Sequence, residues 1–357
     1  MEFVKKTNYD YDIRLFKDRK DVFWYGILAL ALIVGPIFAP EYVLTLGVFV
    51  GIYVVAGAGL MVLSGYAGQI SLGHAAFMAI GAYTSAVLQQ AGVPFPLAFV
   101  ASGLLAALIG LIVGLPALRL HGIYLAIATL AFAFIIEEIL TRWEGVTNGA
   151  SGMMVATMSF AGWSAHASID KFYVTLAVAV LALLAVKNLL RAPSGLAMMA
   201  VRDSETAAQA MGVNLARTKL TAFAISAALT GLAGALYADV IRFISPDQFT
   251  ITMSIELLVL IFIGGIGSLH GVVFGAIFVV ALPQLISEVK DFLPRYVAEQ
   301  PGLQSAVYGF LLLFFIIVEP GGIFGIWMKI KFYFTQFPFY KKGELRRNKS
   351  FVKAERW

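Results

Sequence analysis

Apolar runs of about 20 residues recur along this chain from Val22 to Met328. The hydrocarbon core of a bilayer is about 30 Å thick, so a helix needs roughly 20 apolar residues to cross it. Of the 357 residues, 60% are hydrophobic and only 13% are charged, whereas roughly a quarter of the residues in a soluble domain are charged. The sequence therefore predicts an all-α polytopic integral membrane protein.

We expect about ten transmembrane helices in this chain. Their predicted ranges are 22–39, 43–63, 70–90, 97–118, 122–141, 172–190, 219–240, 254–268, 271–286 and 303–325. The eighth and ninth ranges are short and rich in glycine, so they could also form one broken excursion into the membrane instead of two full crossings.

Basic residues concentrate in three regions: residues 1–21, the loop 191–218 with its flanks, and the tail 329–357. Loops rich in Lys and Arg stay in the cytoplasm, so both termini are predicted to be cytoplasmic, which requires an even number of crossings such as ten. The same count places the loop 142–171 outside. The predicted organisation is a cytoplasmic segment 1–21, a transmembrane domain 22–328 and a basic cytoplasmic tail 329–357. Residues 1–21 hold acids as well as bases, and we interpret them as a segment that faces solvent or the lipid surface and not as a signal peptide.

The chain lacks the motifs of known catalytic and metal sites. It has no cysteine and no Gly-Lys dipeptide, hence no phosphate-binding P-loop. Its four histidines, His74, His121, His166 and His270, are scattered without metal-ligand spacing. We therefore predict no catalytic residue, no metal site and no cofactor bound by this chain. The net charge of +5 resides mainly at the termini and the long loop, so no nucleic acid partner is expected.

Four acidic residues fall in the end turns of the predicted spans: Glu137, Glu138, Asp239 and Glu256. Acids at these positions are expected to lie at the membrane interface, where water reaches them. The alternative is that one of them couples transport to protons or sodium ions, because ionisable residues inside the membrane are costly and often functional.

A polar, glycine-rich break interrupts the apolar pattern between the second and third spans. Its candidate residues are Ser64, Gly65, Gly68, Gln69, Ser71, Gly73 and His74. Irregular backbone is tolerated at membrane depth only where protein or a water-filled path covers it. One interpretation is a polar hinge between the two helices. The other is a translocation path, in which N–H groups of the resuming helix meet a substrate carboxylate.

A second glycine-rich break follows about 200 residues later, at residues 264–271. Gly267, Gly271 and Gly275 have the small-xxx-small spacing that allows helices to approach closely. We expect this contact to lie within the bundle.

The loop 191–218 is predicted to contain a short helix on the cytoplasmic face. Ser204 can cap it, Glu205 falls in its first turn, and Gly212 is placed to end it. Small residues at 207 and 208, with Met211, are predicted to share one nearly flat side. This helix is either a docking surface for another protein or a surface helix that covers the end of the bundle.

Together with this loop, three segments resemble the permease subunits of bacterial ABC importers for branched-chain amino acids, specifically the M-type of two paralogues. The segments are "LSGYAGQISLGHAAFMAIGAY", "LRLHGIYLAIATLAFAFIIEEI" and "VLIFIGGIGSLHGVVFGAIF". The resemblance covers about Val43 to Gly325.

This resemblance implies a function and a set of partners. A permease of this family pairs with its H-type paralogue, above two cytoplasmic ABC ATPases that use ATP and Mg²⁺, and receives its cargo from a periplasmic substrate-binding protein. Ser204, Glu205, Ala207, Ala208, Met211 and Gly212 would then form the ATPase-coupling loop.

The cargo is less well defined than the transport machinery. Related permeases carry urea, short amides and sugars, so an importer of urea, a short amide or another amino acid is the first alternative. An ion-coupled secondary transporter is the second. Residues 145–155 could meet the binding protein, although Asn148 stands where the family often has glycine.

Overall fold

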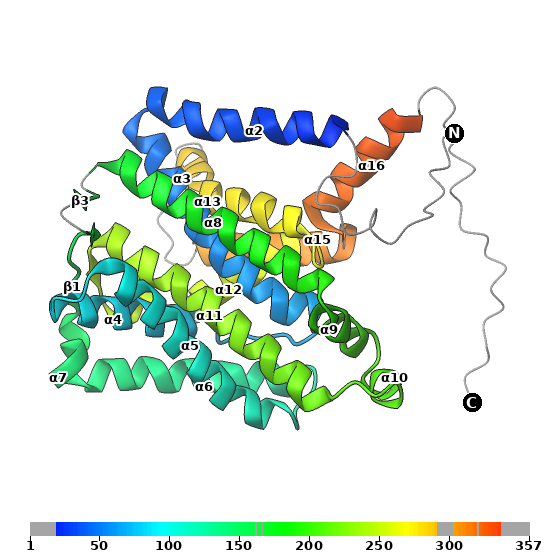
Figure 1. Ribbon diagram of the computed structural model, residues 1–357, viewed down its shortest axis with the longest axis horizontal. Coiled ribbons are helices and arrows are strands. Elements are labelled where there is room, and N and C mark those ends of the chain that lie inside the picture. Colours follow the sequence, from blue (N-terminus) through cyan, green and yellow to red (C-terminus); the bar gives the residue numbers. More distant parts are fainter. Residues whose placement is uncertain (1–18, 161–162, 166, 291–302, 320, 337–357) are drawn as a thin grey trace.

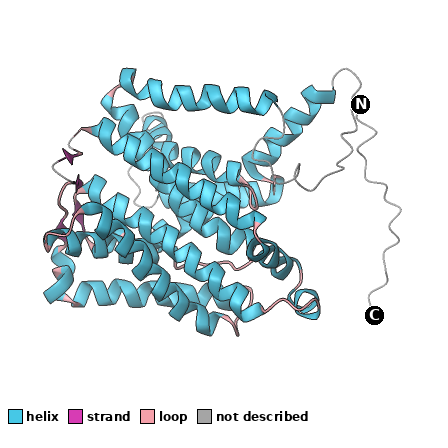
Figure 2. Ribbon diagram, in the orientation of Figure 1, coloured by secondary structure: helices cyan, strands magenta, loops and turns pink. Residues whose placement is uncertain are grey.

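The structure, a computed structural model, describes residues 19–160, 163–165, 167–290, 303–319 and 321–336. Within these ranges the chain is mainly helical, and strands are restricted to short pairs near one end of the bundle (Figure 2). Each of the ten predicted ranges overlaps a helix of at least 14 residues. The helices are α2 (Arg19–Phe38), α3 (Glu41–Leu60), α4 (His74–Gln90), α5 (Phe95–Ala117), α6 (Ile123–Arg142), α8 (Ser168–Arg191), α11 (Leu215–Ile241), α12 (Ile251–Gly264), α13 (Leu269–Lys290) and α15 (Leu303–Val318).

Seven segments of the described chain are long and apolar enough to cross a membrane. They are Glu41–Tyr66, Phe95–Ala117, Ile123–Arg142, Ser168–Arg191, Leu215–Ile241, Pro246–Gly264 and Leu269–Ser287. The eighth and ninth predicted ranges both belong to this set, because a 3₁₀ turn, η3 (Pro246–Gln248), precedes α12 and extends its span. The multi-pass character of the chain is therefore confirmed, while the total of ten crossings stays a prediction.

A helix that was not predicted lies at the predicted C-terminal boundary of the transmembrane domain. The tenth range, 303–325, contains the end of α15 at Val318 and the start of a further helix, α16 (Gly322–Gln336). The predicted boundary at residue 328 thus lies inside a helix. Apolar residues on α16 continue past the first lysines, so a change of composition did not mark its end. The remainder of the predicted tail, and most of segment 1–21, lie outside the described residues.

Helix α11 lies at the centre of the bundle and packs mainly against α3, α4 and α5. Small residues allow this close packing. A Cβ atom on Gly81 of α4 would collide with the carbonyl oxygen of Gly231 on α11. Because neither helix carries a side chain at this crossing, the two backbones touch and α11 remains inaccessible to lipid along this face.

The glycines of the second break pack within the bundle, as predicted, but Gly264 takes part in the contact in place of Gly267. A Cβ on Gly271 would lie 2.7 Å from the carbonyl oxygen of Gly264, and one on Gly275 would lie 3.3 Å from the Gly264 Cα. These contacts join α12 to α13. Gly267 is not part of them, since it lies in the turn between the helices at φ 84°. Gly271 and Gly275 thus share the face of α13 that meets Gly264 of α12.

The two ends of the bundle carry different connections (Figure 1). At one end lie α9 (Pro193–Asp203) and α10 (Glu205–Ala210), which belong to the loop 191–218. At the opposite end lie α7 (Glu144–Thr147) and β1 (Met153–Met154), which belong to the loop 142–171. The two loops that were predicted to face opposite sides of the membrane are thus separated by the length of the helices.

Hydrogen bonds and short strands hold the described residues of the loop 142–171. A 3₁₀ turn, η2 (Gly149–Ser151), follows α7, and β1 pairs antiparallel with β4 (Phe243–Ile244). A second pair joins β2 (Ser159–Phe160) to β3 (Trp163–Ser164). Asn148 adopts a left-handed conformation at φ 59°, and its amide donates a hydrogen bond to the Gly152 carbonyl at 2.7 Å. Asn tolerates this conformation better than most residues.

Candidate functional site

The polar break between α3 and α4 has a defined backbone path. Helix α3 continues into a π-helical stretch, η1 (Met61–Tyr66), and α4 begins only at His74. Within the break, the Ser64 hydroxyl donates to the backbone carbonyl of Gln69 at 3.0 Å, and the backbone N–H of Gln69 donates to the backbone carbonyl of Leu63 at 3.0 Å. Gly68 has a φ of 70°. The irregular backbone is therefore held by its own polar groups, which is the condition for such backbone in a region without water.

His74 is the centre of a buried hydrogen-bond network. Its side chain is fully buried. Its Nδ1 atom lies 3.0 Å from the Ser71 hydroxyl, and its Nε2 atom lies 2.7 Å from the hydroxyl of Ser226 on α11. One imidazole thus joins the break to the central helix through hydrogen bonds.

Hydroxyl groups from two further helices complete this junction. Thr129 on α6 accepts a hydrogen bond from the Leu72 amide at 3.0 Å, and Ser254 on α12 accepts one from the Ala75 amide at 3.1 Å. The Gly73 amide donates to Ser71 at 3.3 Å. These are the N–H groups that the path interpretation assigned to a substrate carboxylate. In this conformation protein oxygens accept from them instead.

Arg202, at the C-terminal end of α9, connects the loop 191–218 to the break. Its guanidinium donates to the Gly65 carbonyl at 3.1 Å and pairs with Asp203 at 3.0 Å. Its side chain also covers Gly68, where a Cβ atom would lie 2.8 Å from the Arg202 Cγ. Arg202 was not predicted from the sequence, because a basic residue in a basic loop carries no distinguishing pattern.

Helix α10 has the caps that the sequence predicts. The Ser204 hydroxyl accepts a hydrogen bond from the Ala207 amide at 3.3 Å. At the other end, the Val213 amide donates to the Ala208 carbonyl at 3.0 Å and the Gly212 amide to the Gln209 carbonyl at 2.9 Å. Gly212 has a φ of 86°, so the helix ends in a Schellman motif. The element spans six residues, in agreement with the short helix that was predicted.

The exposed side of α10 differs from the prediction. Ala207 is exposed and Met211 is 84% exposed, but Ala208 is only 2% exposed. Residues 207 and 211 share a side because they are four positions apart, whereas 208 is turned by about 100° from 207 and faces the protein. Ala208 therefore cannot contribute directly to a surface for a partner.

Glu205 anchors α10 to the bundle through both of its carboxylate oxygens. Oε1 lies 2.7 Å from Nζ of Lys219 on α11, and Oε2 lies 3.1 Å from Nε2 of His121 in the turn between α5 and α6. The Lys219 side chain is only 2% exposed. Partial burial raises the pKa of the Glu205 carboxyl, but the hydrogen bonds and charges of Lys219 and His121 together outweigh it and hold the pKa below its usual range.

This cluster was not predicted from the sequence, although a signal was present. Lys219 directly precedes the long apolar stretch of α11, and a buried lysine requires a partner. The nearest acid that is not on the same helix is Glu205. The pairing with His121 joins residues 84 positions apart and could not be read from one sequence.

The four acids of the membrane part have different environments, which corrects the uniform prediction. Asp239 is fully buried, near the Met158 backbone and the charge of Lys171. Water therefore does not reach it, contrary to the prediction. Glu256 is half-buried and accepts a hydrogen bond from the Tyr53 hydroxyl at 2.9 Å. Glu138 is exposed and pairs with Arg142 one turn away.

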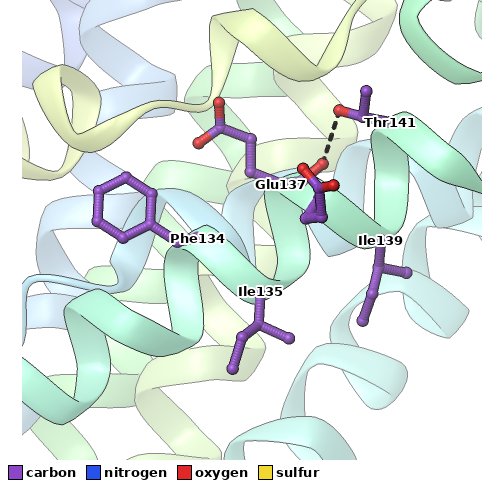
Figure 3. Close-up of a pocket in the computed structure, with 6 residues that line it drawn as sticks. Phe134, Ile135, Glu137, Ile139 and Thr141 are labelled. Carbon is purple, nitrogen blue, oxygen red and sulfur yellow. Dashed lines mark hydrogen bonds between the residues drawn. The ribbon is translucent and has the colours of Figure 1, made fainter.

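Glu137 and Glu138 lie in a shallow groove along α6, shown in Figure 3. The groove is otherwise lined by Phe134, Ile135 and Ile139, and the Thr141 hydroxyl donates to the Glu137 carbonyl at 2.8 Å. All six lining residues come from one helix, so the groove is a property of the outer face of α6. Among the described residues, no group of three or more His, Asp or Glu side chains is arranged to hold a metal ion.

Comparisons with known proteins agree on one family. A family model described as branched-chain amino acid transport system / permease component matches residues 42–316. The high-affinity branched-chain amino acid transport system permease protein LivM of Escherichia coli (strain K12) is 33% identical over 77% of this chain and 70% of its own length. The LivM protein of Salmonella typhimurium (strain LT2) is 35% identical over 68% of this chain and 63% of its own length.

A relative of the second paralogous type also matches. The probable branched-chain amino acid transport permease protein LivH of Methanocaldococcus jannaschii is 26% identical over 58% of this chain and 66% of its own length. The match to the LivM proteins of the two bacteria is longer and closer. No solved structure matches this chain.

Proposed function

The chain belongs to the family of branched-chain amino acid transport permeases, and we propose that it is the M-type permease subunit of an ATP-driven ABC importer. It is a multi-pass inner-membrane protein. Its proposed cargo is leucine, isoleucine and valine. The observation that supports this most directly is the family match over residues 42–316, combined with the names of the LivM relatives.

The proposed topology has ten crossings with both termini in the cytoplasm. Opposite placement of α9 and α10 at one end, and of the loop 142–171 at the other, supports this arrangement. The basic charge of the loop 191–218 supports a cytoplasmic location for its end of the bundle.

Helix α10 is the proposed contact with the ATPases. Ala207 and Met211 form its exposed side, while Glu205 attaches the helix to α11 and to the α5–α6 turn. A movement of an ATPase would therefore pull on a buried lysine and not on a free loop. Arg202 offers a second connection, from α9 to the π-helical stretch.

The polar break acts in this proposal as a hinge between α3 and α4, and not as a substrate site. The amides at the start of α4 already have hydroxyl partners on α6 and α12, which supports the hinge. Motion transmitted through Arg202 would act on this junction.

The paired subunit is proposed to be an H-type paralogue, since relatives of both types match this chain. Two cytoplasmic ABC ATPases would bind ATP and Mg²⁺, because this sequence contains no P-loop, and a periplasmic substrate-binding protein would deliver the cargo. This chain itself would bind no cofactor. Membrane lipid would surround the exposed apolar faces of its helices.

The test is uptake of radiolabelled leucine by vesicles that contain the chain with its paralogue, both ATPases and the binding protein. Each component and internal ATP are withheld in turn. Uptake that requires every component supports the proposal. Full dependence on the components with uptake of urea or a short amide, but not leucine, would change the cargo. Leucine uptake driven by an ion gradient without ATPases would replace the mechanism by that of a secondary transporter, with the buried Asp239 as its first candidate residue.

A further inference from the structure

A cavity of about 340 Å³ lies between α3, α12 and α13. Its volume falls within the range of roughly 300–1,000 Å³ that small-molecule sites occupy. Leu46, Phe49, Val279 and Val280 supply apolar walls, and among the described lining residues Glu256 is the one with a charged side chain. One carboxylate beside aliphatic and aromatic walls is a chemical complement to a small molecule with one positive charge and an apolar body.

Among the described residues, one hydrogen bond to one carboxylate oxygen positions the Glu256 side chain. The Tyr53 hydroxyl donates to its Oε2 atom at 2.9 Å. Within the part of the chain that the structure describes, no Lys, Arg or His forms an ion pair with this carboxylate. Carboxylates in the membrane part of a protein are costly and usually paired. A half-buried acid that has a positioning hydroxyl but no cation is therefore arranged to receive a positive charge from a ligand.

The cavity lies toward the end of the bundle that carries β1 and β4. Glu256 is in the second turn of α12, which follows η3 and β4 directly, and β4 pairs with β1 in the loop 142–171. Tyr42 and Thr45, in the first turns of α3, form the neighbouring part of the lining, together with Gln284 of α13. Under the proposed topology this is the periplasmic end, where cargo enters.

We propose that this cavity is a binding site on the entry path for the ammonium group and aliphatic side chain of the cargo. The Glu256 carboxylate accepts from the ammonium group, and the walls formed by Leu46 and Val280 contact the side chain. The cargo carboxylate faces the polar rim, where Tyr42, Thr45 and Gln284 offer neutral donors. This inference rests on the proposed function and adds a residue that recognises the α-amino group. A neutral urea or amide would make no use of Glu256.

The absence of cysteine from this chain allows a direct test. In the complete complex, a single Thr45→Cys variant, exposed at the cavity rim, is labelled with a membrane-impermeant maleimide. We expect leucine and 3-methylbutylamine to slow the labelling, and 4-methylpentanoate, which lacks the ammonium group, to have no effect. In the Glu256→Gln background, protection should require at least roughly tenfold more ligand, because a hydrogen bond to a charged group is lost. An Ala150→Cys variant, exposed in η2 at the same end, is the matched control and should be labelled at the same rate with and without ligand.

A second pair of variants separates this site from a merely structural role. Glu256→Gln should raise the KM for leucine uptake at saturating binding protein. Glu137→Gln, the same change in the groove of α6, should leave this KM unchanged. Leucine uptake by the parent complex without any protection at Thr45→Cys, or with equal protection in Glu256→Gln, would overturn the inference and leave the proposed function intact. Lack of ATP-dependent leucine uptake by the parent complex would overturn the proposed function itself.

Discussion

Nζ of Lys219 lies 2.7 Å from Oε1 of Glu205, which joins the central helix of the bundle to the short helix at its basic end. The lysine is 2% exposed and the glutamate 32%. Removing one member of such a pair leaves the other charge without compensation. The pair therefore has two separable effects, on stability and on the transmission of movement.

Glu205→Gln is expected to lower the stability of the subunit by about 1–3 kcal/mol, because Lys219 keeps its charge without a counterion. The double variant Glu205→Gln with Lys219→Met should regain most of that stability but not the ATP-coupled uptake. Thermal unfolding of the solubilised complex and uptake per ATP hydrolysed measure the two effects. Recovery of both in the double variant would show that the pair is structural only.

The same pair predicts a pH dependence. The folded pKa of Glu205 lies below its ordinary value of 4.5. The contribution of the carboxylate to stability is therefore complete above about pH 4.5 and is lost as the pH falls through the folded pKa. In a His121→Ala background, the difference in thermal midpoint between Glu205 and Glu205→Gln should be constant from about pH 8 to pH 5 and should shrink below it. A difference that changes near neutral pH would contradict this assignment.

Ala207 and Ala208 provide a matched pair on α10. Ala207→Arg adds a long side chain on the exposed side and should prevent binding of the ATPases while the subunit keeps its thermal midpoint. Ala208→Arg places the same side chain at a position that is 2% exposed and should destabilise the attachment of α10 by roughly 1–3 kcal/mol, as overpacking does. Co-purification of the ATPases and thermal unfolding measure both variants. Equal effects of the two would mean that the ATPases do not dock on the side of α10 that Ala207 and Met211 form.

Gly68 and Gly92 both have positive φ values, 70° and 84°, but different surroundings. A Cβ on Gly68 would meet Arg202, whereas one on Gly92 would meet nothing within 4 Å. Gly92→Ala should cost about 1 kcal/mol, from backbone strain alone. Gly68→Ala should cost more and should also weaken coupling, because Arg202 must move. Thermal midpoints and uptake rates compare them, and identical losses in both assays would mean that Arg202 has no role at the break.

His74→Ala distinguishes the two interpretations of the break. In the hinge interpretation, loss of the imidazole leaves a cavity and removes the partner of the buried Ser226 hydroxyl, and should lower stability by about 2–4 kcal/mol. In the path interpretation, uptake would fall while stability is kept. Thermal unfolding and leucine uptake are measured on the same preparation. Unchanged stability with reduced uptake would reject the hinge.

The sequence predicted the parts of the fold that depend on local composition. Apolar runs located all ten predicted helices, and Ser204 and Gly212 located the caps of α10. The extra helix α16 was missed, because its apolar residues are mixed with lysines.

What the sequence could not predict are contacts between distant segments. The exposed side of α10 depends on the direction from which α11 approaches, so Ala208 was assigned to the wrong face. Asp239 was placed at the interface because it stands near a helix end, yet the loop 142–171 covers that end and buries it. The pairings of Glu205 with His121, and of Tyr53 with Glu256, join residues 84 and 203 positions apart.

The π-helical stretch Met61–Tyr66 allows the 26-residue helical segment Glu41–Tyr66 to transmit a rotation along its length. Tyr53, near its middle, holds Glu256, and Gly65, at its end, accepts from Arg202. A π-helical turn contains about one residue more than an α-helical turn, so a return to α geometry would rotate the helix before the stretch by about 100° relative to the residues after it. Such a rotation would couple a movement of α9 to a rotation of α3 at the cavity, over a distance that no side chain could span.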